Sequence, residues 1–243
     1  MQYGISFDFW NTLYANGDEE KRHRLRIQYF HTLLSEYRQI SNELVQKAFQ
    51  ASTHMFMDEW INKQRTPRPG ERILYMCEVI GISLPDDIIK KFADYFGRII
   101  DTVPPLRIPY IDAIVPQLAD NFPLAIISDT GYIDGKYIRS FLEKEKILSY
   151  FQSNIFSDEQ EHCKPHASVF QMTCQNLKVN CNRLIHIGDL EHTDVRGIKD
   201  IGGISIKFTG CNDTSITDTQ ADYVVNNYTE LLPLINKITG TNL

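Results

Sequence analysis

Three short apolar runs, each reaching a carboxylate or a hydroxyl, constrain the fold of this 243-residue chain more than any other feature. The first run, residues 3–9, carries Asp8 near its end, the second leads into Ser128, and the third leads into Asp189. Runs of this length and composition predict strands buried in a parallel sheet. In an open α/β sheet, ligands bind outside the carboxyl ends of the strands, where these side chains would lie. An Asp that ends a strand before a turn is also common for structural reasons alone.

Two further elements follow in the same order along the chain. Lys164 stands beside a proline just before a predicted helix, and Asp194 follows Asp189 by five residues. An Asp, a Ser, a Lys and a pair of Asp residues in this order resemble the four motifs of the haloacid dehalogenase-like (HAD) hydrolase superfamily. The spacing also fits, so the resemblance covers the whole chain, and residues 194–202 make its most specific match.

The order of the predicted helices and strands agrees with this resemblance. Residues 16–101 show helical periodicity and no strand, whereas strands and helices alternate from residue 109, as in a parallel sheet covered on both faces. The resemblance to the subgroup with a helical (C1-type) cap implies an α/β fold: a Rossmann-like parallel sheet core with an inserted all-helical cap domain. The implied boundaries are residues 1–14 and 106–243 for the core and 15–105 for the cap. Residues 14–17 and 102–108 would then be the hinges.

The first predicted helix, residues 19–38, carries a basic face opposite its apolar one. The apolar stripe is predicted at Leu25, Tyr29, Leu33 and Tyr37, and the basic face at Lys21, Arg22, Arg24 and Arg26. The ordinary interpretation of such a run is a solvated surface. The sharper interpretation is a positive surface turned toward an anionic substrate.

Charge and cysteine content limit the partners and the compartment. A net charge of −6 argues against a broad nucleic-acid surface. The five cysteines are scattered and form no metal-ligand spacing, which suits reduced thiols in the cytoplasm. No run approaches the roughly 20 apolar residues of a membrane span. We therefore expect a cytoplasmic monomer or homodimer that binds neither nucleic acid nor membrane.

The resemblance implies a nucleophile and a metal site. Asp8 would attack phosphorus and form an aspartyl-phosphate. Asp8, Asp189 and Asp194 would bind Mg²⁺, a cation that prefers oxygen ligands, together with the backbone carbonyl of Trp10. Taken one at a time, the late carboxylates could equally be ordinary loop acids.

The remaining motif residues would hold the phosphate. Lys164 would be the counter-charge to the nucleophile and the phosphate, and the Ser128 and Thr12 hydroxyls would donate hydrogen bonds to phosphate oxygens. Asp129 and Asn11 belong to the same predicted substrate-binding set. The structural alternatives are a helix cap for Ser128 and a surface lysine for Lys164.

Trp10 departs from the phosphatase pattern. Most phosphatases of this family carry an Asp at that position as general acid and base, and an indole cannot exchange protons near neutral pH. Losing such a residue typically costs roughly 10²–10⁴ in rate. The enzyme could act on phosphates with good leaving groups, borrow an acid from His23, His54 or His192, or bind a phosphorylated ligand with little turnover.

The resemblance therefore leaves three functions open. A Mg²⁺-dependent phosphatase of small phosphorylated metabolites is the leading hypothesis. Haloacid dehalogenases carry an aromatic residue at the position of Trp10 and release a halide that needs no proton, but their fourth motif lacks the metal carboxylates that Asp189 and Asp194 would provide. The third hypothesis is a catalytically weak phosphate-binding or regulatory protein.

Overall fold

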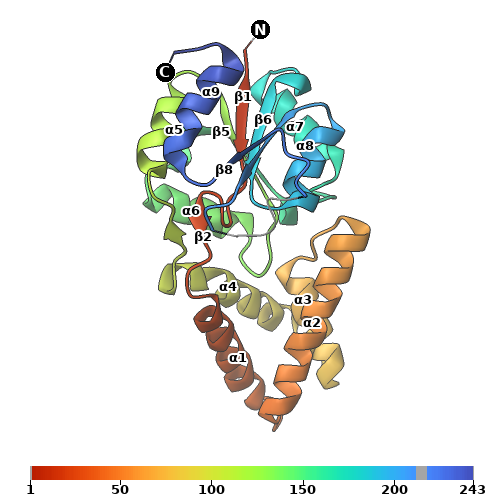
Figure 1. Cartoon of the computed structure of the whole chain (residues 1–243). Coiled ribbons are helices and arrows are strands. Elements are labelled where there is room, and N and C mark those ends of the chain that lie inside the picture. Colours follow the sequence, from red (N-terminus) through yellow and green to blue (C-terminus); the bar gives the residue numbers. More distant parts are fainter. Residues whose placement is uncertain (1, 212–217, 243) are drawn as a thin grey trace. The chain divides into compact units, whose positions relative to one another are not determined.

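The computed structural model describes residues 2–211 and 218–242. The chain forms two compact units (Figure 1). The first contains residues 1–16, 106–129 and 142–243, and the second contains residues 17–105 and 130–141. We call them the α/β unit and the helical unit.

The α/β unit is built on a six-stranded sheet whose neighbouring strands are all parallel. Its order is β5 (Phe151–Phe156), β4 (Leu124–Ser128), β1 (Gly4–Phe7), β6 (Leu184–Gly188), β7 (Ile204–Phe208) and β8 (Tyr223–Val225). All residues of β1, β4 and β6 are buried, as expected of strands covered on both faces. The predicted parallel sheet with covering helices is confirmed.

Helices cover both faces of this sheet. They are α5 (Ile111–Ala119), α7 (Ala167–Leu177), α8 (Arg196–Asp200) and α9 (Leu231–Thr239), whereas α6 (Gly135–Lys144) falls mostly within residues 130–141 of the helical unit. Figure 1 shows α5 and α9 on one side of the sheet and α7 and α8 on the other. Short 3₁₀ turns lie at η1 (Leu148–Tyr150), η2 (Ser157–Glu159), η3 (Cys181–Arg183) and η5 (Tyr228–Glu230).

Two details of this unit differ from the sequence analysis. The segments expected as hinges contain β2 (Tyr14–Ala15) and β3 (Leu106–Arg107), which pair antiparallel. Strands of two residues show no periodicity, so no pattern could reveal them. The segment that includes Asp194 begins as a π turn, η4 (Glu191–Val195), before α8, a feature that the helical pattern from residue 109 onward did not predict.

The helical unit contains α1 (Glu19–Ser35), α2 (Asn42–Lys63), α3 (Pro69–Ile80) and α4 (Asp86–Thr102). Ser41 caps α2 by accepting a hydrogen bond from the Leu44 N–H, as its sequence position predicts. The core is aromatic and is formed by Phe30, Phe49, Phe92, Phe96 and Tyr132. Tyr132 explains why residues 130–141, which the sequence analysis expected in the α/β core, group with the helices.

The buried face of α1 matches the predicted stripe only in part, since Leu33 is buried and Leu25 and Tyr29 are half-buried. Its buried residues are Arg22, Arg26, Phe30, Leu33 and Leu34. Tyr37, expected in the stripe, is 48% exposed and lies beyond the end of the helix. The basic run is therefore only partly solvated: Lys21 and Arg24 are exposed, but Arg22 and Arg26 are not. No helix of the described residues is long and apolar enough to span a membrane.

The packing of α4 gives a test of the helical unit. A Cβ atom on Gly97 would lie 2.0 Å from the Tyr137 ring, whereas one on Gly70 in α3 would meet nothing closer than 4.0 Å. We expect Gly97→Ala to destabilise the protein by about 1–3 kcal/mol through overpacking. Gly70→Ala, the matched control, should be neutral or stabilising by about 0.4–1 kcal/mol. Urea denaturation followed by tryptophan fluorescence measures both, and equal effects would contradict the packing argument.

Candidate active site

Strand order brings three predicted site residues to one edge of the sheet. β1 lies between β4 and β6, and all three strands run in the same direction. Asp8 follows β1, Ser128 ends β4 and Asp189 follows β6. Strand order reverses around β1, and such a switch point is where open α/β sheets bind ligands.

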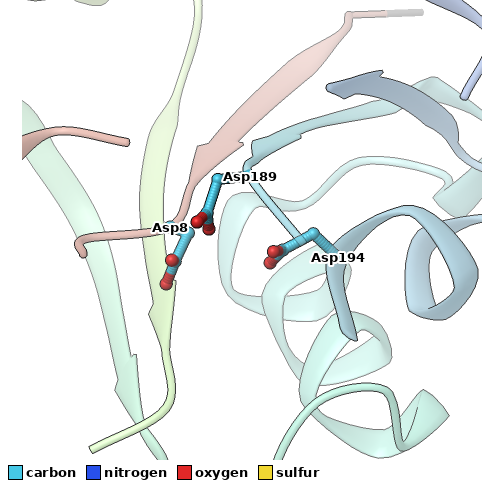
Figure 2. A group of neighbouring side chains, drawn as sticks. All are labelled: Asp8, Asp189 and Asp194. Carbon is cyan, nitrogen blue, oxygen red and sulfur yellow. The ribbon is translucent and has the colours of Figure 1, made fainter. Parts of the chain in front are cut away.

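Asp8, Asp189 and Asp194 form a compact carboxylate cluster (Figure 2). Each offers an oxygen that lies within 4.8 Å of the others, and their side chains are almost completely buried. Asp194 comes from η4, and the other two follow strands. Three buried carboxylates repel one another, so the arrangement requires cations.

Lys164 supplies one of these cations. Its Nζ lies 2.8 Å from Asp8 Oδ1 and 2.6 Å from Asp194 Oδ1, and the residue is 2% exposed. Burial opposes the charge, but Asp194 and Asp8 raise the pKa of Lys164 above its usual range. The Lys164 backbone N–H donates to Asp129 Oδ1 at 3.0 Å. Asp129 therefore contacts the segment that carries the lysine.

Asp194 accepts hydrogen bonds through both of its carboxylate oxygens. Its Oδ2 accepts hydrogen bonds from the Leu190 N–H at 3.0 Å and the Thr193 hydroxyl at 3.3 Å. His186 Nε2 lies 3.0 Å from Oδ1. Burial opposes ionisation, but Lys164 and His186 hold the pKa of Asp194 well below its usual range. These contacts therefore favour the ionised form of Asp194.

Sequence analysis missed the pair that supports Asp194. His186 Nδ1 lies 2.9 Å from Ser6 Oγ, and these residues are in register across β6 and β1. The sequence offered one indication of this pair: Ser6 and His186 are each a polar residue inside an otherwise apolar strand. Gly188 is needed in the same place, because a Cβ there would lie 2.2 Å from Asp194 Cγ.

Asp8 behaves differently from Asp194. Burial raises the pKa of Asp8 to about 6, because the opposing effect of Lys164 is partly cancelled by the repulsion of Asp194. Its backbone N–H donates to the Ile187 carbonyl at 2.9 Å, which ties the residue to β6. Two neighbouring carboxylates thus have pKa values shifted in opposite directions, an arrangement typical of functional sites.

Two buried hydroxyls of the predicted phosphate-binding residues have no hydrogen-bond partner within the described chain. Thr12 Oγ1 and Ser128 Oγ belong to residues that are 0% and 1% exposed. Buried hydroxyls are nearly always hydrogen-bonded in proteins, and an unsatisfied one costs about 1–3 kcal/mol. Both therefore suit a ligand that accepts hydrogen bonds.

The loop after β1 presents the residue that departs from the phosphatase pattern. Trp10 is partly buried and packs edge-on against Phe9 at a centroid distance of 4.8 Å. Asn11 adopts a left-handed φ of 53°, which Asn tolerates well, and its Oδ1 accepts a hydrogen bond from the Asn16 N–H. His192 is exposed on η4, the segment that carries Asp194.

Comparison with protein families agrees with this geometry. The family model described as "Haloacid dehalogenase-like hydrolase" matches residues 5–207. The chain belongs to this family. It is therefore a HAD hydrolase, as the order of its motifs predicted.

Two curated relatives of this HAD hydrolase are named as phosphatases. One is pyrophosphatase PpaX of Bacillus mycoides, 26% identical over 101 residues, which make up 41% of this chain and 46% of the relative. The other is glyceraldehyde 3-phosphate phosphatase of Pyrococcus furiosus, 27% identical over 122 residues, covering 46% and 50%. The chain spans about half the length of the curated relatives it matches.

Solved structures share the fold of this HAD hydrolase. The 2-haloacid dehalogenase of Pseudomonas syringae has a TM-score of 0.74 at 16% identity, covering 98% of this chain and 100% of that one. The HAD-hydrolase YfnB of Bacillus subtilis, in a structure bound to magnesium, has a TM-score of 0.65 at 13% identity, covering 97% and 100%. At these identities the likeness concerns the fold alone.

The raised pKa of Asp8 can be tested directly. With EDTA present, we expect the Asp8 carboxyl to titrate near pH 6, since burial disfavours its charged form. Lys164→Met should raise this pKa further, because the ammonium is the main influence that lowers it. Carboxyl ¹³C NMR measures the titration, and Asp8→Asn assigns the signal. A midpoint near the ordinary value of about 3.9 would contradict the argument.

Proposed function

We propose that this HAD hydrolase is a Mg²⁺-dependent phosphatase of small phosphorylated metabolites that acts through an aspartyl-phosphate on Asp8. The observation that carries the proposal is the buried cluster of Asp8, Asp189 and Asp194 with Lys164 bridging two of its members. The names of the two curated relatives support a phosphorylated substrate.

The carboxylate cluster fits a hard cation. It offers three oxygen ligands and no sulfur or nitrogen, and Lys164 pairs with only two of the three carboxylates, Asp8 and Asp194. Mg²⁺ is commonly held by few carboxylates and keeps several waters. We propose Asp8, Asp189, Asp194 and the Trp10 carbonyl as its ligands. When bound, Mg²⁺ offsets the repulsion between the Asp8 carboxylate and an incoming phosphate.

The residues of the chain supply the remaining chemistry. A carboxylate oxygen of Asp8 attacks phosphorus, and the bond from phosphorus to the leaving oxygen breaks. Lys164 neutralises charge on the phosphoryl group, while Thr12 and Ser128 donate hydrogen bonds to its oxygens. Asp129 holds the lysine segment, and the backbone around Asn11 lines the loop after the nucleophile. Water then attacks the aspartyl-phosphate, releasing phosphate and restoring the Asp8 carboxylate.

Trp10 restricts the substrates of this reaction. Its indole cannot protonate a leaving oxygen, so esters of strongly basic alcohols should react slowly. Acyl and aryl phosphates leave as weak bases and need little protonation. His192, exposed on the same turn as Asp194, is the candidate for a borrowed acid in this unit.

Dehalogenation is the second candidate, favoured by the aromatic Trp10 and by the fold shared with a haloacid dehalogenase. The buried carboxylates oppose it, because they would repel the carboxylate of a haloacid. Halide release without metal would support this candidate over the phosphatase. Phosphate binding without turnover would favour a regulatory protein.

The helical unit and the cysteines bear on substrate selection and on the cellular compartment. The helical unit contains residues 17–105, nearly all of the cap expected at residues 15–105, together with residues 130–141. We propose that it acts as a cap that determines the substrate. None of the five cysteines is in a disulfide, which supports a cytoplasmic setting. We propose a monomer or homodimer there.

The metal assignment predicts a specific loss. Asp189→Ala should weaken Mg²⁺ binding at least tenfold, since it removes one of three carboxylate ligands. The fold should persist, because Asp189 lies outside the strand. Isothermal titration calorimetry measures the affinity, with Asp200→Ala on the surface of α8 as control. Unchanged Mg²⁺ affinity in Asp189→Ala would remove the basis of the metal site.

The role of Trp10 predicts an order of substrates. We expect measurable Mg²⁺-dependent turnover of acetyl phosphate or an aryl phosphate and very slow turnover of sugar phosphates. Trp10→Asp should raise alkyl-phosphate turnover by roughly tenfold or more, a fraction of the usual general-acid effect. Phosphate release measures the rates, and circular dichroism checks that losing the contact with Phe9 leaves the protein folded.

If the wild type cleaves alkyl and aryl phosphates equally fast, and Trp10→Asp folds without any gain, another residue supplies the proton. His192→Ala would then be expected to slow alkyl phosphates selectively.

A further inference from the structure

Two arginines are buried in the helical unit without a carboxylate partner. Arg26 of α1 is 6% exposed and Arg72 of α3 is 4% exposed. Among the described residues, no Asp or Glu oxygen lies within 4.0 Å of either guanidinium. The acidic residue that most affects Arg26 is Glu19, which is exposed.

Arg72 is held by stacking on two aromatic rings and by hydrogen bonds to neighbouring side chains. Its guanidinium carbon lies 3.5 Å from the centroid of the Tyr132 ring and 4.6 Å from that of Phe56. Its Nε donates to Ser52 Oγ at 3.2 Å, and Ser52 also contacts the Tyr132 hydroxyl at 3.0 Å. The Tyr132 side chain is also a hydrogen-bond partner of Arg72, so the polar partners of this guanidinium are hydroxyl groups and not carboxylates.

Arg26 approaches the same tyrosine and has fewer acceptors than Arg72 in the described part of the chain. Its guanidinium carbon lies 5.2 Å from the centroid of the Tyr132 ring. One terminal nitrogen donates to the Phe96 carbonyl at 3.4 Å, while the buried Nε has no acceptor within residues 2–211 and 218–242. Burial lowers the pKa of Arg26 to about 10, and the charges of Arg22 and Arg72 act in the same direction. At neutral pH the group is still a cation.

This arrangement is costly for a purely structural pair. A guanidinium offers five N–H donors, and buried charges are ordinarily paired or fully hydrogen-bonded. Stacking on aromatic rings offsets only part of the desolvation. We propose that Arg26 and Arg72, together with Ser52 and Tyr132, form an oxyanion-binding site within the helical unit. Its ligand is the carboxylate or phosphate group of a small molecule.

The chemistry of the two side chains suits such a group. Planar guanidinium forks bind carboxylate and phosphate oxygens through pairs of N–H donors, and charge-assisted hydrogen bonds of this kind are strong. The Ser52 hydroxyl adds a further polar group beside Arg72. All four residues belong to the helical unit, so the proposal goes beyond the phosphatase chemistry at the strand ends and does not depend on it.

The test is direct binding to the full chain in EDTA, with inorganic phosphate and acetate as separate probes and chloride at equal ionic strength as background. Arginine Nε–H resonances are followed by ¹⁵N NMR in the wild type and in Asp8→Ala, which removes the nucleophile of the strand-end site. We expect saturable shifts of the Arg26 and Arg72 resonances with at least one probe in both proteins. The probe that binds distinguishes a phosphate ligand from a carboxylate ligand.

Substitution provides the matched control. Arg26→Gln should weaken the binding about tenfold or more, the effect of losing a charge-assisted hydrogen bond. Arg24→Gln, on the same helix but exposed and paired with Glu20, should change it less than about twofold. If Arg26→Gln does not fold, Arg72→Lys and the wild-type resonances decide the question.

Three outcomes would overturn the proposal. These are no saturable shift with either probe, equal weakening by Arg24→Gln and Arg26→Gln, and loss of binding in folded Asp8→Ala. The last outcome would assign the anion to the strand-end site. Failure of Mg²⁺ binding or turnover would leave this proposal intact.

Discussion

The ion pairs of Lys164 with Asp8 and Asp194 are the interaction on which the candidate active site depends. Three buried carboxylates within a few ångströms repel one another strongly, and a single buried ammonium at 2.8 and 2.6 Å offsets much of that repulsion. The same contacts make the two aspartates chemically different. Asp194 stays ionised, whereas Asp8 has a raised pKa and is the more easily protonated of the two.

A supporting layer beneath the site keeps this arrangement in place. Ser6 and His186 face each other across β1 and β6, and His186 contacts Asp194 from below. Gly188 provides the space that the Asp194 side chain needs. The site is therefore part of the interior of the sheet, and its geometry is fixed by the same strands that form the core.

The two compact units show opposite imbalances of buried charge. The α/β unit gathers carboxylates that require cations, and the helical unit gathers guanidiniums that require an anion. In each case the described residues leave part of the requirement unmet: the Thr12 and Ser128 hydroxyls have no partner, and the Nε–H of Arg26 has no acceptor. Such unmet groups are rare in protein interiors, which is why both sites are interpreted as binding sites.

The sequence by itself determined the fold class, the membership of the family and the residues of the carboxylate cluster. Apolar runs that lead into Asp8, Ser128 and Asp189 predict parallel strands, and the order of the strand ends then predicts which side chains meet. Local signals such as Ser41 placed helix ends equally well. Only the tertiary structure decided which face of α1 is buried, because Arg22 and Arg26 look like surface residues until the helix packs. Tertiary contacts also decided the roles of His186, Ser6 and Arg72, which join residues from distant segments and leave no periodic pattern. Hydrophobic periodicity shows which face of a single helix or strand is buried. A buried polar contact depends instead on how two helices or strands pack against each other.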